Sequence, residues 1–331
     1  MIYNDIDFNT KKVLITGGAG FIGSNLAFYF QENFPECEVV VFDKFRSEET
    51  FSNGNLKSFG HFKNLLGFHG EIISGDINCA SDIEKLKTYN FDYIFHQAAI
   101  SDTTVMDQAI MVQTNVNAFK TLLDMAIDMN ANMIYASSAA TYGDSDVFSI
   151  GYEKPNNVYG FSKLMMDNLA YKYMKKSPIS IVGLRYFNVY GEREFFKNKT
   201  ASMVLQFGLQ LLSGKNAKLF EGSDKIRRDF IYIQDVIQAN IKACEPKKSG
   251  VYNVGTGNAR SFQDIVDTIK NELNIQITDE YIPNPFIGQY QFFTEADISL
   301  SEEFLEYKPR FSLEEGIKSY INEIKRIDKN G

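Results

Sequence analysis

The sequence predicts an α/β fold in which strands and helices alternate and a smaller domain follows. Short runs of β-branched and aromatic residues alternate with longer stretches of helical period through the first half of the chain. A glycine-rich turn separates the first such run from the first helical stretch. From about residue 190 the alternation ends, and basic, polar and proline-containing segments replace it. These observations predict a doubly wound parallel sheet, followed by a part with a different organisation.

The first expected elements are a strand at residues 12–16, a glycine-rich turn and a helix. Gly17, Gly20 and Gly23 allow a tight turn, a close approach of the backbone to a pyrophosphate, and close packing of the helix on the sheet. The free N–H groups at the start of such a helix bind phosphate. A second strand ends in Asp43, where an acidic residue meets the adenosine ribose in dinucleotide-binding folds. We therefore expect a bound dinucleotide at this turn.

A polar segment follows at residues 46–67, and the sequence does not decide whether it forms a lid or an interface. Further strands are expected after this segment. They are residues 71–74, 91–96, 132–136 and 180–185, with returns to the sheet at 229–236 and 250–255. This order assigns residues 1–190, with return segments near 229–256, to a dinucleotide-binding Rossmann domain. Residues 191–331 are assigned mainly to a substrate-binding domain. No linker rich in proline, glycine or serine separates the two, so we expect an interwoven boundary.

Composition and charge argue against several classes of protein. The 331 residues are 44% apolar and 23% charged, which is ordinary for a soluble globular protein. A net charge of −8 argues against general nucleic-acid binding. Cys37, Cys79 and Cys244 are far apart, which suggests reduced thiols in a cytoplasmic protein. We expect no metal, since the three histidines lack ligand spacing, and no membrane span or signal peptide.

Tyr159 and Lys163 are four residues apart in a segment of helical character, which places both side chains on one face. An ammonium beside a phenol favours the phenolate and is expected to lower the pKa of the tyrosine, which can then serve as a general base. Ser137 and Ser138 end the preceding strand, where a hydroxyl can hydrogen-bond to the same substrate oxygen. Each pattern alone also occurs in surface helices and turns. Their combination with the glycine-rich turn favours catalysis.

With these motifs in place, the sequence resembles the extended short-chain dehydrogenase/reductase family of nucleotide-sugar enzymes over nearly its whole length. The matching residues are glycines 17, 20 and 23, Asp43, Asp76-Ile77, His96-Gln97-Ala98-Ala99, Asn115, Ser137-Ser138, Tyr159 with Lys163, and residues 185–191. The resemblance implies a tightly held nicotinamide cofactor, a nucleotide-sugar substrate, transient hydride transfer from the sugar and a homo-oligomer. It implies that Tyr159 exchanges the hydroxyl proton, that Lys163 lowers its pKa and binds the nicotinamide ribose, and that Ser138 orients the reacting oxygen.

The resemblance also implies the residues that bind the two ligands. The cofactor contacts are Gly17, Gly20, Phe21, Ile22, Gly23, Asp43, Lys44, Asp76, Ile77, Gln97, Ala98, Ala99, Ser101, Asn115, Tyr159 and Lys163. The substrate contacts are Ser138, Asn188, Val189, Lys199, Gln206, Phe220, Glu221, Gly222, Ser223, Arg228 and Tyr290. Gln206 stands where the family carries a histidine. Arg228 is expected to hold the diphosphate, because a guanidinium binds phosphate bidentately, although a surface arginine beside Asp229 is the simpler alternative.

Finer details narrow the activity within this family. Ala139-Ala140-Thr141 stands where the 4,6-dehydratases carry an Asp-Glu pair, so β-elimination lacks its acid and base. Residues 152–160, 192–203, 219–230 and 288–297 resemble the branch that epimerises ADP-heptoses. That branch has a second proton shuttle, which the resemblance assigns to Lys197, with Lys199 as the alternative. Inverting a carbinol carbon through a carbonyl places the oxygen in two positions, and one acid/base cannot easily serve both.

The charges after the second strand leave the choice of nicotinamide cofactor open. Asp43 favours the ribose 2′-hydroxyl of NAD, whereas Lys44, Arg46 and Lys63 supply positive charge for the 2′-phosphate of NADP. The resemblance favours NADP, with NAD as the alternative. The expected reaction converts ADP-D-glycero-D-manno-heptose to its L-glycero epimer at C6 by oxidation and re-reduction. The alternatives are a UDP-hexose 4-epimerase, another nucleotide-sugar oxidoreductase of the family, and a dinucleotide-sensing protein without catalysis.

Overall fold

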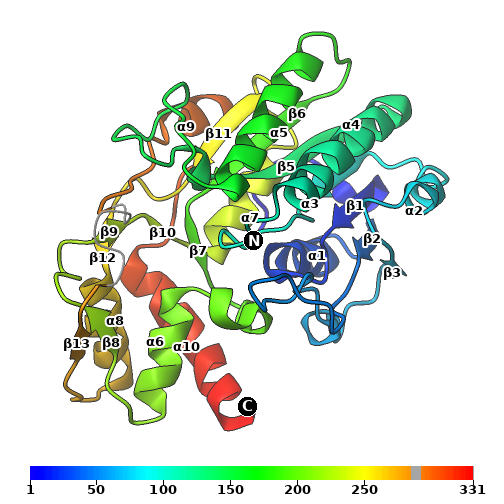
Figure 1. Cartoon of the computed structure of the whole chain (residues 1–331). Coiled ribbons are helices and arrows are strands. Elements are labelled where there is room, and N and C mark those ends of the chain that lie inside the picture. Colours follow the sequence, from blue (N-terminus) through cyan, green and yellow to red (C-terminus); the bar gives the residue numbers. More distant parts are fainter. Residues whose placement is uncertain (285–291, 331) are drawn as a thin grey trace.

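The computed structural model describes residues 1–284 and 292–330 and is built around one large sheet (Figure 1). The sheet has seven strands, in the order β11-β6-β5-β4-β1-β2-β3, and every neighbouring pair is parallel. The strands are β1 (Lys12–Thr16), β2 (Glu38–Asp43), β3 (Glu71–Ser74), β4 (Tyr93–His96), β5 (Asn132–Ser138), β6 (Ile181–Tyr186) and β11 (Gly250–Val254). The strand order reverses between β1 and β4, which in such sheets marks the crevice where ligands bind. The predicted doubly wound parallel sheet is confirmed.

Helices cover both faces of the sheet because successive side chains of each strand point in opposite directions. Val13 and Ile15 of β1 belong to the hydrophobic cluster that includes α1 and α7, whereas Leu14 belongs to the cluster of α2, α4 and α5. The helices are α1 (Phe21–Asn33), α2 (Ala80–Leu86), α3 (Gln108–Val112), α4 (Ala118–Met129), α5 (Val158–Met174) and α7 (Ile233–Lys242). The inner strands, such as β1 and β4, are therefore buried from both sides, which explains their continuous apolar sequences, whereas the edge strand β3 is largely exposed.

A smaller part of the molecule lies beside the sheet, in the lower half of Figure 1. Its helices α6, α8 and α10 pack against one another. They are α6 (Met203–Leu212), α8 (Phe262–Leu273) and α10 (Leu313–Asn330), with α9 (Ser299–Leu305) packed near β11. Short two-stranded sheets accompany them: β8 (Lys218–Phe220) with β13 (Glu280–Ile282), and β9 (Arg227–Arg228) with β12 (Arg260–Ser261). Ser261 begins α8 with a capping box, since its side chain and that of Asp264 each accept the other's backbone N–H.

One predicted return to the large sheet is confirmed and the other is wrong. Residues 250–254 form β11 at the edge of the sheet, beside β6. Residues 230–232 instead form β10, which pairs with β7 (Asn188–Tyr190) in a separate two-stranded sheet. The chain then continues directly into α7, which packs on α1. The apolar run is long enough to supply a short strand and the start of a helix, and periodicity alone does not separate these outcomes.

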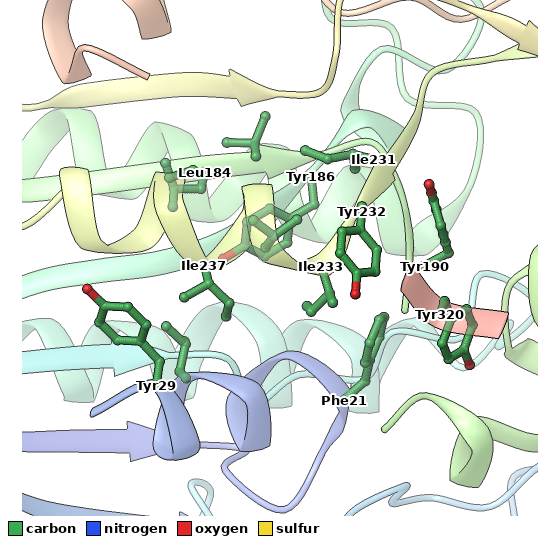
Figure 2. Packing of buried hydrophobic residues seen from close by; sticks show 14 of the residues in the cluster. Phe21, Tyr29, Leu184, Tyr186, Tyr190, Ile231, Tyr232, Ile233, Ile237 and Tyr320 are labelled. Carbon is green, nitrogen blue, oxygen red and sulfur yellow. The ribbon is translucent and has the colours of Figure 1, made fainter. Parts of the chain in front are cut away.

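A single hydrophobic cluster joins the two parts of the molecule. It extends from Phe8 near the N-terminus to Ile324 in α10 and includes both sheet-facing and smaller-part residues. Figure 2 shows side chains of this cluster from α1, β6, β7, β10, α7 and α10. The smaller part therefore packs against the α1 and α7 side of the sheet, near the start of α1.

Candidate active site

A cavity of about 510 Å³ lies at the carboxyl ends of the parallel strands. Its walls come from the glycine-rich turn, the ends of β2, β4, β5 and β6, and the first turns of α5. The predicted cofactor residues that line it are Gly17, Gly20, Phe21, Ile22, Gly23, Asp43, Lys44, Asp76, Ile77, Gln97, Ala98, Ala99, Ser101, Tyr159 and Lys163. The predicted catalytic and substrate residues that line it are Ser138, Val189 and Lys197. The fold thus brings distant motifs of the sequence to one place.

The glycine-rich turn has the backbone shape that a phosphate cradle requires. Gly17 has a φ of +70°, which side chains rarely adopt, and a Cβ at Gly23 would overlap the Gly17 carbonyl oxygen. The turn leads into α1, a helix of 13 residues whose first N–H groups lie at the cavity. Such a helix start attracts negative charge. The turn therefore fits the pyrophosphate of a dinucleotide.

Asp43 is buried at the end of β2, where it holds the glycine-rich turn. Its carboxylate accepts hydrogen bonds from the Ala19 amide at 2.9 Å and the Phe45 amide at 2.7 Å. Burial raises the pKa of Asp43, and these two hydrogen bonds act in the opposite direction. A Cβ at Gly60 would overlap the same carboxylate, so this side chain is enclosed on that side as well. Asp43 also lines the cavity, as its predicted contact with the adenosine ribose requires.

Ser138 and Tyr159 meet where β5 ends and α5 begins. Asn157 starts α5 by accepting a hydrogen bond from the Gly160 amide at 2.8 Å. A Cβ at Gly160 would overlap the Ala140 carbonyl oxygen, so a glycine is needed for α5 to approach the turn after Ser138. Burial raises the pKa of Tyr159, and a hydrogen bond from Ser138 lowers it. The two hydroxyls can therefore face the same substrate oxygen.

The effect of Lys163 on Tyr159 differs from the sequence prediction. Its Nζ donates to the Ala136 carbonyl oxygen at 2.8 Å and lies 5.9 Å from the centre of the Tyr159 ring. Burial lowers the pKa of Lys163 to about 8, while the nearby Asp167 carboxylate acts to raise it. The predicted lowering of the Tyr159 pKa is not found in this structure, because burial of the phenol is the largest effect and the ammonium binds the backbone.

A buried ionic network behind this pair was not anticipated from the sequence. Asp167, one helical turn after Lys163, forms a salt bridge with Arg185 of β6 at 2.8 Å, and the Tyr135 and Ser137 hydroxyls donate to the same carboxylate. Arg185 is itself fully buried and also pairs with Glu153 at 2.6 Å. The network ties α5 to β5 and β6. A charged residue at the end of an apolar strand was the signal that could have indicated it.

Lys197, which follows β7 in the sequence, lines the cavity, whereas Lys199 does not. Lys197 lies on a short 3-10 helix (Phe195–Thr200), with its Nζ 5.5 Å from the centre of the Phe21 ring. Burial lowers the pKa of Lys197, and the charge of Glu194 raises it. Lys199 is exposed and lies away from the cavity lining. The geometry therefore favours Lys197 as the second proton-exchange group.

Residues 51–60, from the polar segment after β2, form one wall of the cavity. Asp102 holds this wall in place, since its carboxylate accepts hydrogen bonds from Asn53 at 3.0 Å and Asn55 at 2.7 Å. Lys57 lines the wall and was not among the predicted cofactor residues, because nothing in its local sequence marks it. Arg46 and Lys63 were expected to offer positive charge to the cofactor, yet neither lines the cavity.

The same segment contacts the short helix that carries Lys197. The rings of His61 and Phe196 stack with their centres 3.8 Å apart and their planes 1° apart. The Arg46 guanidinium donates to the Phe196 carbonyl oxygen. These contacts place the two walls of the cavity side by side.

Several predicted ligand residues do not line the cavity. Asn115 is fully buried, and its side chain bonds to the Ile100 backbone and the Ser162 hydroxyl, so it supports the cavity wall from behind. Gln206 donates to the Ala201 carbonyl oxygen, and Asn188 is exposed beside the cavity residue Val189. The predicted nucleotide contacts Phe220, Glu221, Gly222, Ser223 and Arg228 lie in the smaller part of the molecule. Tyr290 lies outside the described residues.

Within residues 1–284 and 292–330, no group of three or more histidine, cysteine, aspartate or glutamate side chains is arranged to hold a metal ion. None of the helices in this part of the chain is both long and apolar enough to cross a membrane.

The parallel sheet, the glycine-rich turn and the Ser138, Tyr159 and Lys163 cluster define a nucleotide-dependent enzyme of the short-chain dehydrogenase/reductase class. Residues 13–255 match the model of the NAD dependent epimerase/dehydratase family, and the chain belongs to this family. The chain is thus an enzyme of epimerase type.

Solved structures of several family members are similar to this one. The ADP-L-glycero-D-manno-heptose-6-epimerase of Helicobacter pylori is 50% identical, with a TM-score of 0.91 over 98% of this chain and 99% of that one. The UDP-glucose 4-epimerase of Thermotoga maritima is 25% identical, with a TM-score of 0.84 over 96% and 99%. The UDP-glucuronic acid 4-epimerase of Bacillus cereus, solved with NAD, is 28% identical, with a TM-score of 0.80 over 96% and 99%.

Proposed function

We propose that the protein is an NADP-dependent epimerase that converts ADP-D-glycero-D-manno-heptose to the L-glycero form at C6. The observation that carries this proposal is the presence of two proton-exchange groups, Tyr159 and Lys197, in one cavity, from different elements of the fold. Epimerisation through a carbonyl needs such a pair, because the oxygen occupies two positions. The 50% identity with the Helicobacter pylori heptose epimerase supports the choice of substrate.

The residues of the cavity can be assigned roles in this reaction. A bound nicotinamide supplies reversible hydride exchange with the carbinol carbon. Tyr159 takes the proton of the sugar hydroxyl in one orientation, while the Ser138 hydroxyl holds the same oxygen. Lys197 delivers a proton to the oxygen after the carbonyl has turned around. Lys163 binds the nicotinamide ribose beside Tyr159, and its ammonium then stabilises the phenolate.

The choice of NADP rests on charges at the adenosine end of the cavity. Lys44 and Lys57 both line the cavity. In the sequence, Lys44 follows Asp43 directly and Lys57 precedes Gly60 by three residues, and Gly60 packs against the Asp43 carboxylate. Two backbone N–H groups already bind the Asp43 carboxylate, which reduces its repulsion of a 2′-phosphate. Lys44 is paired with Asp76 at 2.9 Å and Lys57 with Glu49 at 3.4 Å, both partly exposed pairs that a phosphate can compete for.

The nucleotide half of the substrate is proposed to extend from the cavity toward the smaller part of the molecule. Asn188 and Val189 of β7 lie at this junction, and Arg228 on β9 remains the proposed contact for the diphosphate. The family resemblance also supports a homo-oligomer. Size-exclusion chromatography with light scattering would test that assignment.

The decisive experiment is incubation with a panel of nucleotide sugars, followed by NMR of the products. ADP-D-glycero-D-manno-heptose is expected to give its L-glycero epimer without net change in NADPH. Turnover of UDP-glucose to UDP-galactose alone would establish the alternative 4-epimerase, and net production of NADPH would mark an ordinary dehydrogenase. Mass spectrometry of ligands released from denatured protein would identify the cofactor directly.

A further inference from the structure

Glu194 is a fully buried carboxylate that joins the two ends of the loop carrying Lys197. One oxygen accepts hydrogen bonds from the Gly191 amide at 3.2 Å and the Ser202 hydroxyl at 2.8 Å. The other accepts from the Ser202 amide at 2.7 Å. Gly191 precedes the short helix of Lys197, and Ser202 follows it as the N-cap of α6. A single side chain thus fixes both points where this loop leaves the rest of the fold.

The charges of Glu194 and Lys197 support each other in this buried setting. The Lys197 amide donates to the Glu194 carbonyl oxygen at 2.9 Å, which places the two residues one 3-10 turn apart. Burial raises the pKa of Glu194, while Lys197 and the hydrogen bonds from Ser202 lower it. Burial lowers the pKa of Lys197, and Glu194 raises it. Without that carboxylate, burial would drive the lysine further toward the neutral amine.

Other charged groups surround the loop, but they bind its backbone or neighbouring rings. Glu323 of α10 accepts the Arg193 amide at 2.8 Å, and the Arg193 guanidinium lies 4.0 Å from the centre of the Phe28 ring. Glu192 accepts the Tyr232 hydroxyl at 2.6 Å. Among the residues that the structure describes, Glu194 is the one whose charge raises the pKa of Lys197.

Tyr320 and Arg46 also lie near the loop that carries Lys197. Burial, and then the Glu194 carboxylate, raise the pKa of the Tyr320 hydroxyl, and Figure 2 shows this ring among the side chains of the large hydrophobic cluster. From the opposite side, the Arg46 guanidinium donates to the Phe196 carbonyl oxygen and so adds a positive charge near the loop.

We propose that Glu194 is a positioning residue, whose carboxylate closes the loop of residues 191–202 and holds Lys197 at the cavity as a charged proton donor. The inference rests on the proposed function, in which Lys197 gives its proton to the sugar oxygen as the C6 carbon is re-reduced. The O–H bond of the product forms as the N–H bond of Lys197 breaks, and the amine regains the proton from solvent or from a substrate hydroxyl in the reverse direction. An amine that is already neutral has no proton to give, so the charge on Lys197 decides the rate.

The test is competitive acetylation of the lysines of the whole protein at a series of pH values, with peptide mass spectrometry to follow Lys197. In Glu194→Gln, the pH midpoint for Lys197 labelling is expected to move to lower pH than in the wild type. The control is Glu323→Gln, which removes the charge of a carboxylate of α10 that binds the backbone of the same loop at Arg193, and it is expected to leave the midpoint unchanged. An unchanged midpoint in Glu194→Gln would overturn the proposal, as would an equal shift in both variants.

Steady-state kinetics and a second variant keep the proposal testable if Glu194→Gln does not fold. Ser202→Gly removes one hydroxyl donor to Glu194 but keeps a residue suited to the N-cap. It is expected to lower kcat severalfold, with KM and the Lys197 midpoint unchanged, because the loop is less firmly closed. Wild-type kcat in Ser202→Gly would show that the hydrogen bond from the Ser202 hydroxyl to Glu194 is not needed to hold the loop.

The failure of this inference differs from the failure of the proposed function. If Lys197→Met retains wild-type turnover of ADP-heptose, Lys197 is not the second proton-exchange group and the proposed mechanism is wrong. If Lys197→Met is inactive but Glu194→Gln keeps both its midpoint and its kcat, the role of Glu194 alone is refuted. In a Lys197→Met background, Glu194→Gln is expected to cause no further loss of kcat, since both changes act on one group.

Discussion

The Lys163 ammonium donates a hydrogen bond to the Ala136 carbonyl oxygen, 2.8 Å away, at the carboxyl end of β5. In this arrangement the ammonium interacts with a backbone carbonyl of the sheet rather than with the Tyr159 hydroxyl. The cation is 2% exposed, and burial lowers its pKa to about 8. If Tyr159 and Lys163 form the proposed catalytic pair, we expect binding of the nicotinamide ribose at Lys163 to bring the ammonium charge to the phenol.

The stability of the cofactor-free protein is expected to rise with pH because of Lys163. Its folded-state pKa of about 8 lies below the ordinary 10.5, so between these values the unfolded chain binds a proton that the folded protein does not. Below pH 8 the buried ammonium costs roughly 3 kcal/mol relative to its neutral form. Denaturant unfolding of wild type and Lys163→Met should therefore show the wild type gaining stability across this window. A constant difference between them would contradict the assignment.

Replacement of the proposed base, Tyr159→Phe, is expected to abolish turnover without loss of the fold. Removal of a general acid/base lowers kcat by about 10²- to 10⁴-fold. The Phe ring keeps the packing of α5, so the dinucleotide should still co-purify with the variant and be detectable by mass spectrometry. NMR of the nucleotide-sugar products measures the activity. Full activity in this variant would refute the mechanism.

Asp167→Asn is expected to destabilise the protein strongly. The change leaves Arg185 fully buried with one of its two carboxylates gone, and breaking a buried pair costs about 3–5 kcal/mol. Urea unfolding followed by circular dichroism measures the loss. Glu84→Gln, which breaks the exposed pair with Lys87, is the matched control and should cost less than about 1 kcal/mol. Equal effects of the two changes would show that the network contributes little.

Gly60→Ala is expected to weaken dinucleotide binding through Asp43. The added methyl group would overlap the Asp43 carboxylate, which would have to leave the Ala19 amide. Overpacking of this kind costs about 1–3 kcal/mol, and the shape of the glycine-rich turn should change with it. Calorimetric titration with NADPH measures the affinity. Wild-type affinity in Gly60→Ala would argue against this role.

Lys57→Ala is expected to reduce the preference for NADPH over NADH. The lysine lines the same cavity as Asp43, so removal of its charge should weaken binding of a 2′-phosphate, by about tenfold, and leave NADH binding nearly unchanged. Fluorescence titration with both nucleotides gives the ratio. Lys63→Ala removes an exposed lysine outside the cavity lining and should change neither affinity. The same loss for both nucleotides in Lys57→Ala would point to a general effect on the wall.

Local patterns allowed the sheet and the centre of the site to be predicted from the sequence. The spacing of Tyr159 and Lys163 and the glycines at 17 and 23 depend only on the geometry of one helix and one turn, so their positions could be inferred. The return at residues 229–236 was wrong because an apolar run does not say whether it pairs with the large sheet or a small one.

Tertiary contacts decided what the sequence could not. Lys57 reaches the cavity only because Asp102 holds its segment there, and Lys197 is separated from Lys199 only by the path of a short 3-10 helix. The direction of the Tyr159 pKa was mispredicted because the depth of burial is a property of the whole fold. The spacing of residues in the sequence therefore indicates which side chains can come together, whereas their burial, and so their pKa, depends on the packing of the whole fold.

The wall formed by residues 51–60 has a consequence for how the enzyme handles its hydride carrier. Asp102 ties that wall down through Asn53 and Asn55, so movement of the wall away from the cavity would break these hydrogen bonds. An epimerase returns every hydride that it removes, and it therefore ends each cycle with the carrier in its starting redox state. Such an enzyme does not need to release the nicotinamide nucleotide and bind a fresh one between cycles. We expect its rate to be independent of the cellular ratio of reduced to oxidised nicotinamide nucleotide, provided that the nucleotide stays bound through the cycle.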